Sequence, residues 1–143
     1  MKEFIAHVRS ADRKEQSVIQ HLLEVGEIAR KNASKLNLAD AGELIGLLHD
    51  LGKLSSAFQA YIKSSEGLLN PDCDAEYVDS DLLKGKIDHS SAGAQWIWEK
   101  CQLWGKQGQL IGQILALCLA SHHSGLIDCL KPDGSFEFKR RIE

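Results

Sequence analysis

The adjacent pair His49 and Asp50, in the stretch LIGLLHDLGK, constrains this chain more than any other feature. The pair ends an apolar helical run and is followed by Gly52 and Lys53. An aspartate is rarely buried unless it is paired or binds a metal ion. Imidazole nitrogen and carboxylate oxygen together suit divalent cations. Taken alone, the pair also fits a plain helix end with surface side chains and a glycine cap.

The other histidines favour the metal-binding interpretation. Three of the six lie on or beside apolar stripes of predicted helices. These stripes are Val18, Val25 and Ile28 around His21, Ile45 before His49, and Ile111, Leu115 and Cys118 before His122. A single histidine on such a face is usually a core residue with satisfied hydrogen bonds. One shared, inward-facing metal centre explains several of them together, as in helix bundles.

The candidate ligands follow a recognisable order: His21, His49-Asp50, His89 in DHSSAGA, and His122-His123 in ASHHSGL. This order resembles the HD superfamily of metal-dependent phosphohydrolases. It is most similar to the HD nuclease domain of the CRISPR-associated helicase-nuclease that degrades DNA in type I interference. The patterns H-D-x-G-K, H-S-x-x-G-A and H-H-S-G-L carry the resemblance, which covers roughly His7 to Asp128.

The chain reads as helices and loops with little strand signal, and the resemblance implies an all-α HD-domain helical bundle with a metal centre between helices. We expect one domain over residues 1–143. Two helices are predicted first, over Lys14–Lys35 and from Asp40 to Gly52, the second with Asp40 and Glu43 as a capping pair. A third helix begins at Ser55 or Ser56. The last two cover Ser90–Trp104, where Ile97, Trp98 and Cys101 face inward, and Leu110–His123. Residues Ser64–Ser80 read as a long loop, and the segment after Gly125 as polar and turn-rich.

The ligand set predicts two ions. One would be held by His21, His49 and Asp50. The second would be held by the same Asp50 together with three further histidines: His89, His122 and His123. Adjacent helical residues point about 100° apart, so Asp50 could bridge both ions while His49 serves one. Two ions roughly 3.5–4 Å apart can activate water for phosphodiester hydrolysis.

Two further residues are candidates with an alternative each. Lys53 could act catalytically with Asp50 by neutralising charge on a phosphate oxygen. Alternatively, it could be a helix-terminal lysine whose charge interacts favourably with the helix macrodipole. Ser90 could bind a phosphate or a ligand, but we favour a helix cap. His7 lies outside the ligand set, and we favour a surface histidine over one that supports the ligands.

Composition limits the function classes. The net charge of −3 argues against a domain that grips duplex DNA by charge alone, so a partner should deliver the nucleic acid. No apolar run can span a bilayer, and no signal peptide is evident. The four cysteines contain no C-x-x-C pair, and Cys118 reads as a small buried residue, so we expect a cytoplasmic protein without disulfides.

The resemblance adds substrate and partners. It implies cleavage of single-stranded DNA that a superfamily 2 helicase domain or subunit feeds in, on recruitment by an RNA-guided CRISPR surveillance complex. The ions would be divalent: Mn, Fe, Co, Ni, Zn or Mg. Aromatic side chains could stack on bases, but helical spacing favours the core for all of them: Phe58, Tyr61, Trp96, Trp98 and Trp104.

The chain departs from the family at two points. Family members carry a further aspartate ligand on a later helix, whereas Asp128 and Asp133 follow His123 too closely to match it, so we expect an incomplete first site. No helicase motif such as G-x-x-x-x-G-K-[ST] occurs, so we expect a C-terminally truncated fragment of a longer protein, or a separate helicase. Two alternatives stay open: an HD phosphohydrolase acting on a nucleotide or cyclic dinucleotide, and a non-catalytic helical module.

Overall fold

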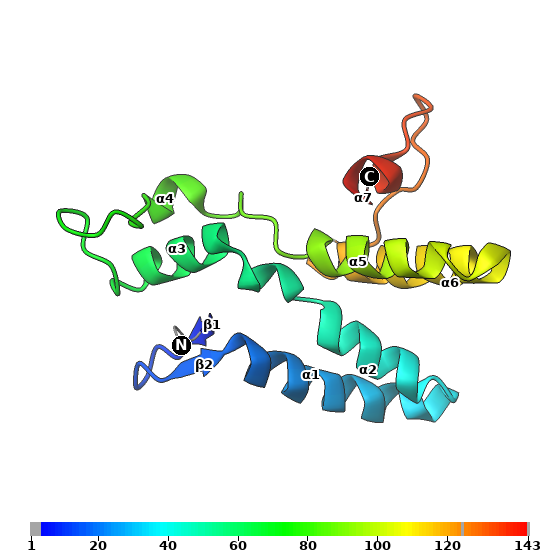
Figure 1. The fold of residues 1–143 in the computed structure, drawn as a ribbon, viewed down its shortest axis with the longest axis horizontal. Coiled ribbons are helices and arrows are strands. Elements are labelled where there is room, and N and C mark those ends of the chain that lie inside the picture. Colours follow the sequence, from blue (N-terminus) through cyan, green and yellow to red (C-terminus); the bar gives the residue numbers. More distant parts are fainter. Residues whose placement is uncertain (1–3, 124, 143) are drawn as a thin grey trace.

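The computed structural model describes residues 4–123 and 125–142, which form mainly helices (Figure 1). In chain order the elements are β1 (Ile5–Val8), β2 (Glu15–Ser17), α1 (Val18–Ala33), the 3-10 helix η1 (Ser34–Leu36), α2 (Ala39–Leu48), the 3-10 helix η2 (Leu51–Leu54), α3 (Ser56–Ser65), α4 (Ser80–Leu83), α5 (Ser91–Gln102), α6 (Gly105–Ser121) and α7 (Glu137–Ile142). The predicted all-α bundle is confirmed, with a two-stranded hairpin added to it. Within the described ranges, no helix has the length and apolar character needed to cross a membrane.

The helix predicted over Lys14–Lys35 is shorter at both ends. Residues Glu15–Ser17 pair antiparallel with β1 instead, so the helix begins at Val18. The Ser17 hydroxyl accepts a hydrogen bond from the Gln20 N–H and caps this start. The hairpin therefore leads directly into α1, beside which α2 runs (Figure 1).

The buried face of α1 differs from the predicted stripe. Val18, Leu22 and Gly26 are buried at i, i+4 spacing, whereas Ile28 is 61% exposed. Glycines of α1 and α2 meet where the two helices pack together. A Cβ added to Gly46 of α2 would lie only 2.7 Å from the Cα of Gly26 of α1. The close helix approach thus selects glycine, which hydropathy alone does not reveal.

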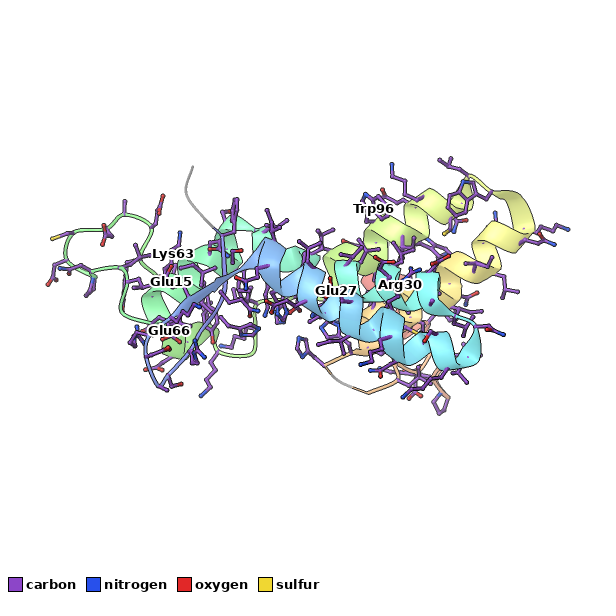
Figure 2. All side chains as sticks on the ribbon, turned by 90° about the horizontal axis from the view of Figure 1, so that it is seen from below. Glu15, Glu27, Arg30, Lys63, Glu66 and Trp96 are labelled. Carbon is purple, nitrogen blue, oxygen red and sulfur yellow. The ribbon has the colours of Figure 1, made fainter. Side chains whose placement is uncertain are left out.

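The start and end of α2 also differ from prediction. Leu38 is the N-cap, without a side-chain hydrogen bond, and the predicted capping pair Asp40 and Glu43 binds Arg30 of α1 instead. Arg30 on α1 is labelled in Figure 2. The helix ends at Leu48 rather than at Gly52, and the chain turns through residues 49 and 50 into η2. His49 is therefore the C-cap of α2, and Asp50 is the N-cap of η2.

The middle of the chain follows the prediction. Ser55 caps α3 by accepting a hydrogen bond from the Phe58 N–H. A long connection then leads from Glu66 to α4, which begins at Ser80, where the predicted loop ends. In Figure 1 this connection extends away from the rest of the molecule.

Helices α5 and α6 form the second close pair (Figure 1). Ile97 and Cys101 are buried on α5, as predicted, and Trp98 packs partly against the core. On α6 the predicted stripe is wrong, because Cys118 is exposed and Ile111 is 50% exposed. The buried face carries small residues at every fourth position instead: Gly108, Gly112, Ala116 and Ala120.

The segment after Gly125, predicted as turn-rich, contains α7. Phe138 and Ile142 lie one turn apart on it and are buried in the main core with Ala94, Ile97 and Leu119. The Phe138 ring stands edge-on to Trp98, with 5.8 Å between ring centroids. The C-terminal helix α7 therefore packs on α5.

Candidate metal centre

All six histidines of the chain gather around one carboxylate. Asp50 lies between α2 and η2 and is only 3% exposed. The residues that surround it come from β1, α1, the α2–η2 turn, the turn before α5, and the end of α6. These are His7, His21, His49, His89, His122 and His123, with Lys53 of η2.

The Oδ2 atom of Asp50 meets the N-terminal half of the chain. The Nε2 atoms of His21 and His49 lie 3.0 and 3.1 Å from Oδ2 and 3.2 Å from each other. The Lys53 ammonium is 2.9 Å from the same oxygen. A 3-10 turn stacks residues i and i+3, which explains why Lys53 reaches Asp50 although the α-helix has ended.

The Oδ1 atom meets the second half of the chain. Its distance to Nε2 is 3.3 Å for His122 and 3.7 Å for both His89 and His123. The Nε2 atoms of His89 and His123 lie 2.7 Å apart. The side chains predicted as ligands therefore lie on both sides of the carboxylate, and their role as metal ligands stays a prediction.

The histidine rings are oriented by backbone carbonyls. The Nδ1 atoms of His49, His122 and His89 lie 2.8, 2.6 and 3.1 Å from the carbonyls of Gly46, Leu119 and Ile87. A carbonyl only accepts, so each Nδ1 donates, and a neutral ring then points the Nε2 lone pair at the centre. Such an arrangement of imidazole and carboxylate groups could hold a metal ion. The donor set fits divalent transition-metal ions.

Two motif glycines bring the halves of the site together. The Gly52 N–H donates to the His89 carbonyl at 3.1 Å, and a Cβ on Gly52 would lie 2.5 Å from that oxygen. A Cβ on Gly93 would lie 2.0 Å from the carbonyl oxygen of Leu48. Both positions accept only glycine at this separation, so the glycines of H-D-x-G-K and H-S-x-x-G-A hold His89 against the His-Asp turn.

The carboxylate stays ionised in this environment. Burial alone raises the pKa of Asp50, but the contacts with His122, His49 and the Lys53 ammonium lower this pKa far below its ordinary value. Burial lowers the pKa of both His21 and His7, which favours their neutral, ligating form. For His122, burial lowers the pKa but the contact with Asp50 outweighs it and raises the pKa.

Ser90 does not cap α5 with its side chain, contrary to our expectation. It occupies the N-cap position, but Asp88 accepts hydrogen bonds from the backbone N–H groups of Ser90 and Ser91. The Ser90 and Ser91 hydroxyls accept hydrogen bonds from Arg141 of α7, at 2.7 and 2.8 Å. This network next to His89 was missed from the sequence, because Arg141 lies 50 residues or more away from its partners.

His7 lies at the surface, as expected, but it also makes an unexpected contact with Lys53. It is exposed, yet its Nε2 lies 2.9 Å from the Lys53 Nζ, and its ring stands 4.8 Å from that of His21. The motif AHVRS gave no signal of this contact, because β1 was not predicted.

The aromatic residues divide between core and surface. Phe58 is buried, as expected, and its ring centroid lies 5.3 Å from that of His89. Trp96 and Trp104 are 43% and 65% exposed, so the core interpretation is wrong for them. Figure 2 labels Trp96 on α5.

Comparison with known families agrees with this geometry. The family model described as "Cas3, HD domain" matches residues 8–139. The chain therefore belongs to the Cas3 HD-domain family, which confirms the resemblance. Membership implies a metal-dependent hydrolase of the HD class associated with CRISPR systems. No curated protein shows a significant match to the sequence.

Proposed function

We propose that this chain is a metal-dependent endonuclease that cleaves single-stranded DNA during CRISPR interference. The observation that carries the proposal is the division of imidazoles between the two oxygens of Asp50. A carboxylate with nitrogen ligands on both oxygens is suited to bridge two divalent ions, for which Mn, Fe, Co, Ni or Mg are the candidates.

We infer the ligands of the two proposed ions from the side chains near each oxygen of Asp50. His21 and His49 would hold the ion at Oδ2. His89, His122 and His123 would hold the ion at Oδ1. Such a pair of ions supplies an activated water and stabilises the attacking and leaving oxygens of the phosphodiester. This chemistry needs no side-chain nucleophile.

We propose that Lys53 acts through Asp50. Its ammonium can donate three hydrogen bonds and has three acceptors within reach: Asp50 Oδ2, His7 Nε2 and the Ala6 carbonyl at 3.4 Å. It is only 4% exposed. Contact with a phosphate would require one of these partners to be exchanged, so holding the carboxylate in place fits the geometry better.

The substrate and partners are inferred from charge and exposure. Side-chain exposure rises to 55% at His123, so the Oδ1 side is the open face for a phosphate. The net charge of −3 supports delivery of the strand by a superfamily 2 helicase, with recruitment by an RNA-guided surveillance complex in the cytoplasm.

Cleavage of circular single-stranded DNA tests the proposal. Wild type, Asp50→Ala and the exposed control Asp40→Ala would be compared with Mn, Co, Ni or Mg. We expect cutting that depends on the ion and falls by about a thousandfold or more only in Asp50→Ala. Absence of cutting, with release of phosphate from nucleotides or hydrolysis of cyclic dinucleotides, would favour the alternative phosphohydrolase. Absence of bound metal would favour the non-catalytic module.

A further inference from the structure

The first strand brings a sixth imidazole, that of His7, close to Asp50. Ligand atoms of His7, His21 and Asp50 all lie within 4.8 Å of one another. Metal–ligand bonds of about 2.0–2.2 Å allow one ion to reach atoms separated by up to about 4.4 Å. The three atoms therefore need only a small adjustment to share an ion.

The His7 ring turns its Nε2 atom toward the Lys53 ammonium, beside Asp50. An ammonium donates and cannot accept, so the 2.9 Å contact with Lys53 Nζ requires a lone pair on His7 Nε2. That lone pair points toward the cation that also contacts Asp50 Oδ2. His7 and Asp50 thus already bind one positive charge between them.

The backbone that carries His7 is fixed. The buried Gln59 side chain accepts a hydrogen bond from the Ile5 N–H and donates to both the Ile5 carbonyl and the Lys53 carbonyl. Ile5 and Ala6 are both buried, and the strand register shifts between Ile5 and His7. Such a bulge re-aims the following side chain. The position of His7 is therefore built into the fold.

We propose that His7 is a ligand of the ion at Asp50 Oδ2, together with His21 and His49. The inference rests on the metal centre of the proposed function and completes its Oδ2 side, giving three imidazoles at each carboxylate oxygen. His7 also precedes the residues matched by the family model.

Three variants separate a ligand from a residue that only supports Lys53. His7→Gln keeps an acceptor for the ammonium but removes the imidazole. His7→Cys offers a thiolate ligand, and His7→Ala is its matched control because it has the same four native cysteines. Co²⁺ and Mn²⁺ binding would be followed by calorimetry, metal analysis and absorption spectroscopy.

We expect two ions per wild-type chain, and one of them weakened by more than about tenfold in His7→Gln. His7→Cys with Co²⁺ should show a thiolate-to-cobalt charge-transfer band that His7→Ala lacks. Wild-type affinity at both sites in His7→Gln, without a band in His7→Cys, would overturn the role of His7 while leaving the metal centre intact. Absence of any bound ion in wild type would overturn the metal centre as a whole.

Discussion

The two oxygens of Asp50 face unlike surroundings. At Oδ2, His21 and His49 are 13% and 15% exposed, and Lys53 adds a positive charge. At Oδ1 the three imidazoles are 20% to 55% exposed. Within the described part of the chain, Lys53 is the one lysine or arginine in a salt bridge with Asp50. In the proposed centre, the positive charge of Lys53 at Oδ2 leads us to predict that the Oδ1 side binds its ion more tightly.

The largest effect is expected at Lys53, which distinguishes the two sides. Lys53→Met removes the cation and leaves a buried carboxylate uncompensated, which should cost about 3 kcal/mol of unfolding free energy in chelator-treated protein. Urea denaturation would measure this loss. Added Mn²⁺ should restore much of it, because the ion neutralises the same oxygen and stabilises the folded state by mass action. Equal losses with and without Mn²⁺ would contradict the assignment of Lys53 to the Oδ2 side.

Deleting one histidine on each side tests the difference in affinity. His122→Ala should weaken the tighter of two Mn²⁺-binding steps, and His21→Ala the weaker one, each by roughly a hundredfold. Both rings contact Asp50 with similar exposure, so the two variants control for one another. Isothermal titration would separate the steps. If both variants lost the same step, the two-sided description would be wrong.

A smaller effect is expected from Arg141, which supports only the Oδ1 side. Arg141→Ala removes its bonds to Ser90 and Ser91 beside His89 and should weaken the tighter step by about tenfold. The Oδ2 step should be unchanged in the same titration. Arg140→Ala, on the same helix but in contact with Glu137, is the matched control. A change in the Oδ2 step alone would contradict the assignment of Arg141 to the Oδ1 side.

Local sequence was sufficient to identify the candidate ligands that gather at Asp50, but not the contacts that support them. The His-Asp pair, His89 and the double histidine stand in short motifs with their own glycines, so their chemistry is local. His7 depends on β1 pairing with the polar segment Glu15–Ser17 and on Gln59, which lies 54 residues from Ile5. Contacts of that separation leave no periodicity in the sequence.

Helix faces were misassigned for a related reason. Large apolar residues occur on several sides of α6, and the closest helix contact uses Gly108, Gly112 and Ala116 instead. Ile111 and Cys118 are more hydrophobic than these small residues, so hydropathy predicts that they are buried. In the structure both Ile111 and Cys118 are exposed. For α7, only Phe138 and Ile142 are buried, a pattern too short to predict a helix from a polar segment.

Electron paramagnetic resonance of Mn²⁺-loaded protein tests the central claim most directly, namely that Asp50 joins two ions. Ions bridged by one carboxylate, roughly 3.5–4 Å apart, are magnetically coupled. We predict two Mn²⁺ per chain with a coupled spectrum in wild type, and loss of the coupling in Asp50→Asn. A wild-type spectrum of isolated Mn²⁺ ions, or a single ion per chain at saturation, would contradict the account.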